Sequence, residues 1–559
     1  MRYFEIDELN KTINFDFPKD DDIIRRIKDC DFNARFNPEL LIWIVPVNIY
    51  SKGRIINIIQ EYQFKQRIAE VRQDVVVDYG QNEIDYAYLQ GLCDSKNFTY
   101  SPRNYQLEAL GYCRKVGSLI NGDDVGLGKT FEAIIYAEVT NSFPCIVFVP
   151  ATVKEQWKKE WIKIANNKNR TVSTIRSKPL KSRPNDWSAD VVIINYDIIG
   201  KKQGKGTSVK FDELLSTQWK MAICDEAHYL KDKKAQRSSA MKMITKKIDL
   251  IQLLTGTAVM SKPSELWNLL VLIKRDHLIA KDWHQYIRRY CGGYRGKFGW
   301  VSDGATNIIE LNEILRKTCY LRREKKDVLS ELPRAIKQVI EIDISNKKEI
   351  DKATENFIDY VRETQGDEKA DKAMEAEHLV AIGMLRKLSA QGKLKEAEKF
   401  LREWKDCSKP KLVFFGIHRE QLIYLSEKFS CPIIAGGTSS ENKQIIKEEW
   451  IASDAPFLFI NIGSGGTGLD GLQSVCSNMA IYELPWRPSD IVQVIGRLER
   501  SGQTVPPNIY FLLNFSTIDH QMWEMLKDKE AVTEAVNKGI DVRRQKSGLR
   551  AVIQKLLKK

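Results

Sequence analysis

Residues 122–139 read GDDVGLGKTFEAIIYAEV, a glycine-rich loop that leads into an apolar helical run. Gly126 and Gly128 allow the backbone to wrap around a polyphosphate, and the amides at the start of the following helix face the anion. Lys129 would reach the β- and γ-phosphates, and the hydroxyl of Thr130 would ligate Mg²⁺. The strict phosphate-loop pattern requires glycine where Asp123 stands, so the loop alone leaves a chance match open.

A second motif, DEAH at residues 225–228, ends an apolar run of strand type. Asp225 is placed to hold Mg²⁺ through water, and Glu226 is placed to orient and deprotonate the attacking water. The alternative is an exposed acidic turn, which the preceding GLGKT makes the weaker interpretation. His228 could couple the nucleotide site to the rest of the domain, or it could merely cap the turn.

A third motif, QVIGRLERSGQ, begins at Gln493 and places Gln493, Arg497 and Arg500 on one face of a predicted helix. Phosphoryl transfer is catalysed mainly by positioning and charge neutralisation, so arginines from a second domain can couple hydrolysis to domain closure. Two arginines on a helix face can also simply be solvated. With the two earlier motifs present, we expect both arginines to share catalysis with Lys129 and Glu226.

Short apolar runs of parallel-strand type alternate with helical segments in two stretches of the chain. The pattern predicts an α/β fold with two parallel-sheet lobes in tandem. The expected strands of the first lobe are CIVFVP (145–150), VVIINY (191–196), MAICDEAH (221–228) and LIQLLTGT (250–257). Those of the second lobe are KLVFFG (411–416), CPIIAGG (431–437), FLFINIG (457–463), MAIYEL (479–484) and NIYFLLN (508–514).

The texture of the sequence divides the chain into four parts. We expect a small α+β N-terminal domain at residues 1–95 and lobe 1 with the nucleotide site at 96–333. Lobe 2 is expected at 334–540, with a helical insertion at about 345–405, followed by a basic tail at 541–559. The insertion resembles a helical hairpin or protrusion. In the N-terminal domain, residues 35–47 predict two strands around a turn, and residues 53–75 predict a helix with a charged face.

Composition narrows the class of protein. The 559 residues carry a net charge of +13, which favours a polyanion partner but also fits an ordinary basic protein. Hydrophobic residues make up 43%, which excludes wholesale disorder, and no apolar run reaches the roughly 18 residues of a membrane span. The ten cysteines include no C-x-x-C pair, which excludes a zinc finger and favours a reducing compartment.

An ordered series of motifs from about residue 100 to 530 resembles superfamily 2 helicases, specifically the SWI/SNF-type DNA translocases. The series comprises SPRNYQ (101–106), GDDVGLGKT (122–130), PATVKEQWKKEW (150–161), INYDII (194–199), DEAHYLKDKKAQRS (225–238), LTGTAVMSKPSELWNLL (254–270), YLRREKKDVLSELP (320–333), INIGSGGTGLDGLQ (460–473), LPWRPSDIVQVIGRLERSGQ (484–503) and IDHQMWEMLKDKEAV (518–532). The resemblance implies two RecA-like lobes, the use of ATP with Mg²⁺, and a C-terminal helix that braces the lobes.

The resemblance also assigns roles to individual residues. It implies that Gln106 reads adenine and that Asp123 is the family's own residue in a loop completed by Leu127. The departures from the family pattern are Gly122 and Asp124 in this loop, together with Ala258 for proline and Ser261 for asparagine downstream. The implied contacts to the DNA backbone are Thr152, Lys154, Asn195, Thr467 and Trp486, of which Trp486 could equally be a buried anchor of its lobe. The basic loop 200–210 and the tail could add electrostatic grip or could simply be solvated.

The form MSKPSEL (260–266) is closer to the annealing helicases named for the HARP domain, and RFNPELLIWIVP (35–46) resembles part of their accessory fold. The leading prediction is therefore a compact bacterial or viral translocase that remodels forks or branched DNA in recombination, repair or replication restart. The alternatives are a motor that displaces proteins such as RNA polymerase, an RNA helicase, and an ATP-switched recruitment scaffold. We expect a cytoplasmic monomer, in a bacterial nucleoid or a virus-infected cell, with DNA and replication or single-strand-binding proteins as partners and no membrane.

Overall fold

The structure is a computed structural model that separates into two compact units, Met1–Val76 and Val77–Lys559. The residues that it describes are 3–7, 12–17, 20–30, 34–37, 42–47, 51–66, 84–179, 182, 184–204, 206–256, 263–296, 299–302, 304–355, 377–407, 409–465 and 469–538. Within these ranges, no helix combines the length and apolarity that crossing a membrane requires. Ala258, Ser261, Thr467 and the tail 541–559 lie outside the described residues.

The N-terminal unit is a small α+β fold around a five-stranded sheet with the order β3-β4-β2-β1-β5. Its elements are β1 (Tyr3–Asp7), β2 (Thr12–Asp16), α1 (Asp21–Cys30), β3 (Arg35–Asn37), β4 (Ile42–Pro46), α2 (Ser51–Glu61) and β5 (Lys65–Gln66). Phe15 and Val45 of the sheet bury their side chains against Ile27 of α1 and Ile55 of α2. The two strands predicted in residues 35–47 are confirmed as the antiparallel pair β3 and β4.

The helix predicted over residues 53–75 is wrong in its second half. Helix α2 ends at Glu61, and Gln63 takes a positive φ of 51°, a conformation that a right-handed helix cannot continue through. The chain then forms the short strand β5, which pairs with β1 in parallel. Residues beyond Gln66 in that predicted helix lie outside the described part of the chain.

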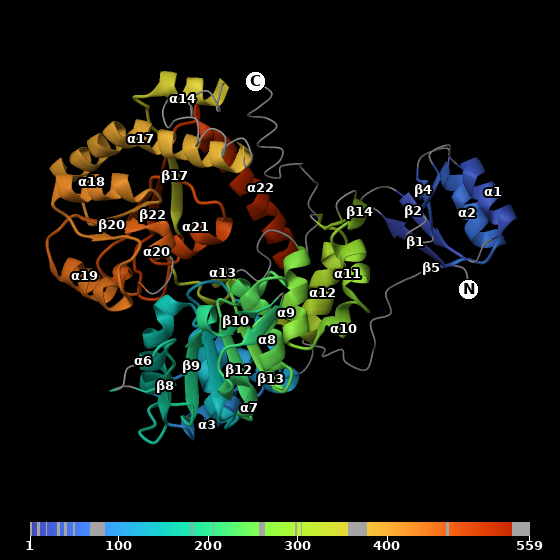
Figure 1. The fold of residues 1–559 in the computed structure, drawn as a ribbon, viewed down its shortest axis with the longest axis horizontal. Coiled ribbons are helices and arrows are strands. Elements are labelled where there is room, and N and C mark those ends of the chain that lie inside the picture. The colour runs from blue at the N-terminus through green and yellow to red at the C-terminus, as the bar shows by residue number, and fades with distance from the viewer. Residues whose placement is uncertain are drawn as a thin grey trace. The chain divides into compact units, whose positions relative to one another are not determined.

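Lobe 1 is built on a seven-stranded parallel sheet with the order β16-β6-β13-β12-β7-β9-β8 (Figure 1). Its elements are α3 (Tyr86–Asp94), α4 (Asn104–Val116), β6 (Leu119–Asn121), α5 (Lys129–Val139), β7 (Cys145–Val149), α6 (Lys154–Ala165), β8 (Val172–Thr174), β9 (Val191–Asn195), β10 (Gly200–Gln203), β11 (Gly206–Val209), α7 (Glu213–Ser216), β12 (Met221–Asp225), α8 (Gln236–Thr245), β13 (Leu250–Leu254), α9 (Leu266–Leu272), α10 (Asp276–Ile279), α11 (Trp283–Tyr290), β14 (Tyr294–Gly296), β15 (Gly299–Val301), α12 (Ile308–Thr318), β16 (Tyr320–Leu321) and α13 (Lys325–Val328).

The central strands of lobe 1 are apolar throughout because both faces of the sheet are covered. Along β7, Cys145 and Val147 belong to the core that contains α3 to α6, whereas Ile146 and Phe148 belong to the core that contains α8 and α9. Leu89 of α3 is buried in the first of these cores. Lobe 1 therefore begins before residue 96, earlier than the predicted boundary, because α3 packs on this lobe.

Lobe 2 has a six-stranded parallel sheet with the order β17-β22-β21-β18-β20-β19. Its elements are β17 (Ile336–Glu341), α14 (Lys347–Glu355), α17 (Glu377–Asp406), β18 (Leu412–Gly416), α18 (Arg419–Phe429), β19 (Ile433–Ile434), α19 (Ser440–Ala452), β20 (Phe457–Asn461), α20 (Ile462–Gly465), β21 (Asn478–Ile481), α21 (Pro488–Ile495), β22 (Asn508–Leu513) and α22 (Ile518–Lys538). Together the two sheets confirm the predicted α/β fold with two parallel-sheet lobes in tandem.

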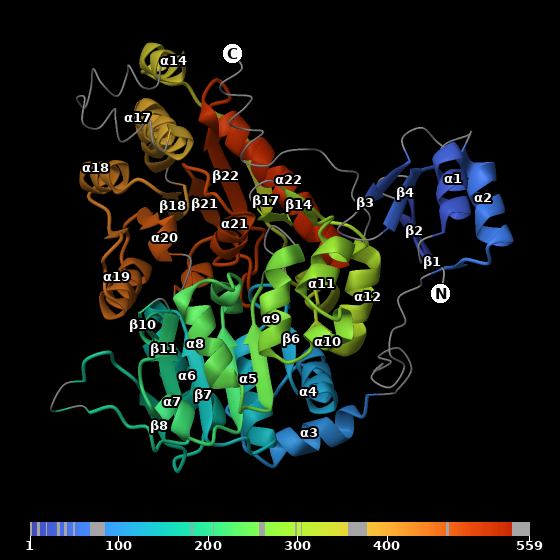
Figure 2. The same ribbon diagram turned by 45° about the vertical axis from the view of Figure 1, so that its right-hand side comes forward.

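The long helix α17 accounts for most of the described part of the predicted insertion, but it is not a protrusion. It lies along lobe 2 beside α14 and α18 (Figures 1 and 2). Leu385 and Leu401 on this helix are buried in the cores of the lobe. Most of the charged residues in the last four turns of the helix are exposed, but Lys393 is fully buried.

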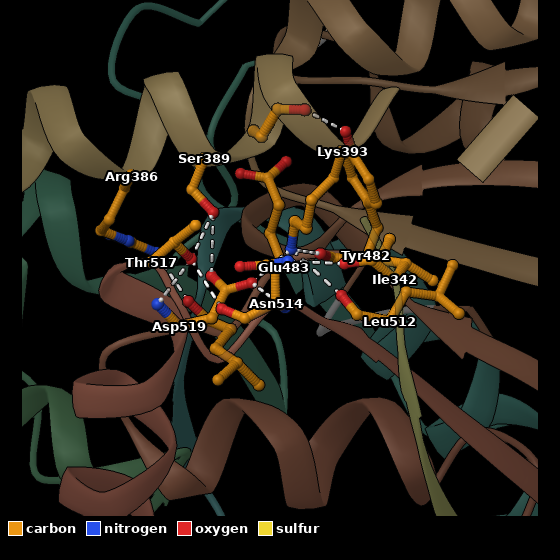
Figure 3. Close-up of polar contacts among 12 residues, drawn as sticks. Ile342, Arg386, Ser389, Lys393, Tyr482, Glu483, Leu512, Asn514, Thr517 and Asp519 are labelled. Carbon is orange, nitrogen blue, oxygen red and sulfur yellow. Dashed lines mark hydrogen bonds and ion pairs between the residues drawn. The ribbon is translucent and has the colours of Figure 1, made fainter. Parts of the chain in front are cut away.

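Lys393 ties α17 to the carboxyl ends of two strands (Figure 3). Its ammonium group donates to the carbonyl of Tyr482 at 2.6 Å and to that of Leu512 at 3.0 Å, and it pairs with the Asp519 carboxylate at 2.7 Å. Asp519 also accepts the backbone N–H of Asn514 at 3.1 Å. Because Asp519 lies in the first turn of α22, the network positions this helix, which also contacts α12 of lobe 1.

Replacing Lys393 by methionine should destabilise the protein strongly. The Lys393→Met side chain has similar length but leaves the buried Asp519 carboxylate without its cation, which costs about 3–5 kcal/mol when one partner of a buried pair is removed. Thermal unfolding should show a clearly lower midpoint, whereas Lys395→Met, at an exposed position on the same helix, should stay close to the wild type. Equal midpoints for the two variants would contradict the anchoring role of Lys393.

Candidate active site between the two lobes

The glycine-rich loop leaves strand β6 and turns into helix α5. Gly126 and Gly128 have φ values of 95° and 86°, which glycine adopts without strain. The ammonium group of Lys129 donates to the carbonyls of Asp123 and Asp124 at 2.6 and 3.0 Å. Burial lowers the pKa of Lys129, although neighbouring carboxylates oppose this shift. The loop carbonyls thus hold the lysine at the start of the helix, where phosphate would bind.

The structure brings Gln106 against this loop. Its amide nitrogen donates to the carbonyl of Leu127 at 3.4 Å, and its amide oxygen accepts the backbone N–H of Arg103 at 3.0 Å. A Cβ placed on Gly128 would lie 2.8 Å from the amide nitrogen of Gln106, so a larger residue would have to displace this amide. The predicted adenine-reading and phosphate-binding residues therefore belong to one site.

The predicted metal ligands lie on adjacent elements of lobe 1. Thr130 is the second residue of α5, and Asp225 is the last residue of β12. The Asp225 carboxylate accepts the indole N–H of Trp157 at 2.7 Å and the backbone N–H of Glu226 at 2.9 Å. Burial, reinforced by the Glu226 charge, raises the pKa of Asp225 to about 7. A hydroxyl and a buried carboxylate supply the oxygen ligands that Mg²⁺ prefers, so these residues fit the metal.

Glu226 joins the two lobes. One of its carboxylate oxygens lies 3.1 Å from Nδ1 of His228, and the other accepts the amide N–H of Gln493 from lobe 2 at 3.3 Å. Burial would raise the pKa of Glu226, but His228, Lys129 and Arg497 together outweigh burial, so the pKa is lowered overall. Glu226 is therefore ionised near neutral pH, as a general base must be. His228 lies within ion-pair distance of this carboxylate.

The two predicted arginines do not lie on one helix face as expected. Helix α21 ends at Ile495, and a Cβ on the next residue, Gly496, would lie 2.9 Å from the Val125 side chain of the glycine-rich loop. Arg497 and Arg500 follow in the turns after the helix. Their guanidinium groups nevertheless converge, since both bind the Asp470 carboxylate, Arg497 at 2.8 Å.

The segment YLRREKK (320–326) holds the glycine-rich loop from behind. Arg323 binds the fully buried carboxylate of Asp123 through its backbone N–H at 2.7 Å and through its guanidinium, which also pairs with Glu132 at 2.7 Å. Arg322 pairs with Asp124 at 2.5 Å. The Asp123 carboxylate therefore faces Arg323, and its contribution to the predicted nucleotide site is the backbone carbonyl that holds Lys129.

Lys325 continues this segment to lobe 2. Its backbone N–H donates to the Asp124 carboxylate at 3.0 Å, and its ammonium group binds the carbonyl and the carboxylate of Glu499 at 2.6 and 3.1 Å. Sequence reasoning missed Arg322, Arg323 and Lys325. The available signal was that the two adjacent acidic residues of the loop, Asp123 and Asp124, match two adjacent arginines in YLRREKK. That segment was noted only because it resembles a family motif.

The ring of Tyr320 leaves no room for a side chain at position 122. A Cβ on Gly122 would lie 2.7 Å from Cζ of the buried Tyr320 ring, closer than two carbon atoms can pack. Gly122, one of the departures from the family pattern, therefore leaves room for the tyrosine on the neighbouring strand β16.

Gly122→Ala should overpack this contact and lower the free energy of unfolding by about 1–3 kcal/mol. The same substitution should cost less in a Tyr320→Val background, because the smaller side chain makes room for the methyl group. Thermal unfolding of the single and double variants measures this coupling, with Gly91→Ala, which meets nothing within 4 Å, as the control. Strictly additive effects would contradict the proposed contact.

The predicted DNA contacts are only partly brought together. Thr152 follows β7 and Asn195 ends β9, so both lie at the carboxyl edge of adjacent strands of lobe 1. Lys154 instead donates to the carbonyl of Ile175 at 2.7 Å. Trp486 packs against the core of lobe 2, and the Arg386 guanidinium lies 4.7 Å from its ring centre. This placement fits the alternative interpretation, in which Trp486 anchors its lobe.

The basic loop at residues 200–210 forms the hairpin of β10 and β11. Its described lysines Lys201 and Lys202 are exposed, and Lys210 donates to the hydroxyl of Ser177 at 2.5 Å. The hairpin thus presents positive charge to solvent from lobe 1.

A phosphate loop, an acidic pair and two arginines from a second parallel-sheet lobe define a two-lobed helicase-type ATPase. Comparison with known families agrees, because the SNF2-related domain matches residues 81–394 and the helicase conserved C-terminal domain matches residues 392–502. The chain belongs to the SNF2-related family. The predicted SWI/SNF-type resemblance is thereby confirmed.

Two curated relatives show the degree of similarity. One is the SWI/SNF-related matrix-associated actin-dependent regulator of chromatin subfamily A-like protein 1 of Xenopus tropicalis. The chain is 26% identical to it over 424 residues, and the match covers 74% of this chain and 42% of that protein. It is 27% identical over 448 residues to the DNA annealing helicase and endonuclease ZRANB3 of Homo sapiens, covering 76% of this chain and 39% of that protein. The chain thus spans less than half the length of both relatives.

Among solved structures, the chain is similar to the Sulfolobus solfataricus SWI2/SNF2 ATPase core in complex with dsDNA. The two are 19% identical, the match covers 79% of this chain and 94% of that chain, and the TM-score is 0.38.

Proposed function

We propose that the protein is a DNA-dependent ATPase that moves along duplex DNA and remodels forks or branched DNA. The observation that carries this proposal is the shared site between the lobes, in which Glu226 of lobe 1 contacts Gln493 of lobe 2. Beside it, Arg500 of lobe 2 lies next to Gly126 of the glycine-rich loop, and Arg497 acts electrostatically on Glu226. A site built from two lobes links each hydrolysis event to a change in the contact between them.

Each group in the site has a chemical task. The backbone amides of the loop and Lys129 would bind the phosphates, and Thr130 with Asp225 would hold Mg²⁺. Bound Mg²⁺ supplies neutralisation of the phosphate charge. The ionised Glu226 orients the attacking water and accepts its proton, and His228 holds the carboxylate for that step. Arg497 and Arg500 stabilise the negative charge that develops on the transferred phosphoryl group.

The choice of DNA as the polymer rests on charge and on the family. The net charge of +13 and the exposed lysines of the β10–β11 hairpin favour a polyanion. The relative from Homo sapiens is named a DNA annealing helicase, which supports fork or branched DNA as the preferred form. Three further points stay predictions. The protein would act as a monomer, its location would be the cytoplasm of a cell, in a bacterial nucleoid or a virus-infected cell, and its partners would include replication or single-strand-binding proteins.

Steady-state ATP hydrolysis with duplex DNA, single-stranded DNA, a model fork and structured RNA tests the proposal. We expect the fork to stimulate hydrolysis more than plain duplex does. Lys129→Ala should lower the rate by about 100-fold or more, since it removes a charge from the phosphate site. Lys220→Ala is the matched control, because this exposed lysine precedes the start of β12, whereas Asp225 lies at the end of that strand.

The other outcomes separate the alternatives. Equal stimulation by fork and duplex would favour a motor that displaces proteins such as RNA polymerase. Stimulation by RNA alone would point to an RNA helicase, and nucleotide binding without turnover would point to a recruitment scaffold. Each of these results would contradict fork remodelling.

A further inference from the structure

Asp470 lies in the contact between the lobes, although no catalytic role follows from its sequence. One oxygen of its carboxylate accepts N–H groups from both Arg497 and Arg500. The other oxygen accepts the amide N–H of Gln156, on helix α6 of lobe 1, at 2.9 Å. A single carboxylate therefore holds the two arginines of lobe 2 and links them to lobe 1.

The surroundings fix this carboxylate in its ionised form. Gln156 also donates to Glu160 at 2.8 Å, and Lys447 donates to the backbone carbonyl of Asp470 at 3.0 Å. Burial would raise the pKa of Asp470, but Arg500 and then Arg497 outweigh burial and lower it to about 2. Two arginines this close would repel each other, and the negative carboxylate between them removes that repulsion.

The arginines that Asp470 holds lie beside the candidate nucleotide site, Arg500 next to the phosphate loop and Arg497 within electrostatic range of Glu226. A Cβ on Gly126 would be 3.5 Å from Cβ of Arg500, and Arg497 acts electrostatically on Glu226. Guanidinium groups bind carboxylate and phosphate oxygens in the same geometry. A terminal phosphate in the loop would therefore compete with the Asp470 carboxylate for the same pair of arginines.

We propose that Asp470 is a positioning residue that holds Arg497 and Arg500 until the γ-phosphate of ATP replaces its carboxylate. This proposal rests on the proposed function, because it requires that ATP binds at the loop. The exchange trades one set of charge-assisted hydrogen bonds for another, so neither arginine is left buried without a partner. ADP lacks the γ-phosphate and leaves the arginines on Asp470, together with the link to Gln156.

Removing the charge of Asp470 should strengthen the binding of a triphosphate alone. In Asp470→Asn, the affinity for the non-hydrolysable analogue AMP-PNP should rise about tenfold, the scale of one charge-assisted hydrogen bond freed from competition. The affinity for ADP should not change. Displacement of a fluorescent ADP derivative from the full-length protein measures both affinities without hydrolysis. Gln156→Ala, which removes only the lobe 1 partner, should shift AMP-PNP binding in the same direction by a smaller factor.

Two controls make the result specific. Asp454→Asn removes an exposed carboxylate from the same lobe and should change neither affinity. The gain from Asp470→Asn should shrink in an Arg497→Ala background, because one of the arginines that the carboxylate holds is then absent. Thermal unfolding confirms that each variant is folded.

Three results would overturn the proposal. Asp470→Asn could change both nucleotide affinities by the same factor, could leave AMP-PNP binding unchanged, or could weaken it; each would reduce Asp470 to a structural contact. Failure of the proposed function is distinguishable, because it is measured as the absence of DNA-stimulated ATP hydrolysis by the wild-type protein, whereas the nucleotide affinities of the variants test Asp470 without hydrolysis.

Discussion

The ion pair between Arg323 and the buried carboxylates of Asp123 and Glu132 is the constraint on which the rest of the site depends. It joins residues 200 positions apart and lies behind the glycine-rich loop. Buried ion pairs contribute little net stability, but breaking one is costly, so they specify geometry. Here the specified geometry is that of the loop, whose carbonyls in turn place Lys129.

The same segment carries the constraint from one lobe to the other. Lys325 holds Asp124 through its backbone and Glu499 of lobe 2 through its side chain. Asp470 and Gln156 form a second connection between the lobes, and Glu226 and Gln493 form a third. All three connections are polar, so their side chains can exchange partners when nucleotide or DNA binds. Opening an apolar interface would instead expose its hydrophobic side chains to water. A motor that must close and reopen needs contacts of this kind.

The parallel-sheet lobes could be predicted from the sequence, because buried strands leave continuous apolar runs. The candidate residues of the nucleotide site could be selected as well, because phosphate chemistry requires specific residue types at short spacing. Their catalytic roles stay predictions. Strands β6 and β16, of three and two residues, could not be predicted, since they exist through pairing with distant strands. The roles of Arg323 and Asp470 depend on contacts between remote segments. The burial of Lys393 contradicts the usual exposure of lysine and follows only from its three partners.

If the two lobes share one catalytic site, the most direct measurement is the rate of ATP hydrolysis by Arg497→Ala at saturating DNA. The turnover number should fall by about 1,000-fold, the scale for an arginine that stabilises a transferring phosphoryl group. Arg402→Ala, in an exposed ion pair on α17 of the same lobe, should hydrolyse ATP at the wild-type rate. Hydrolysis at the wild-type rate by Arg497→Ala would contradict a catalytic site shared between the lobes.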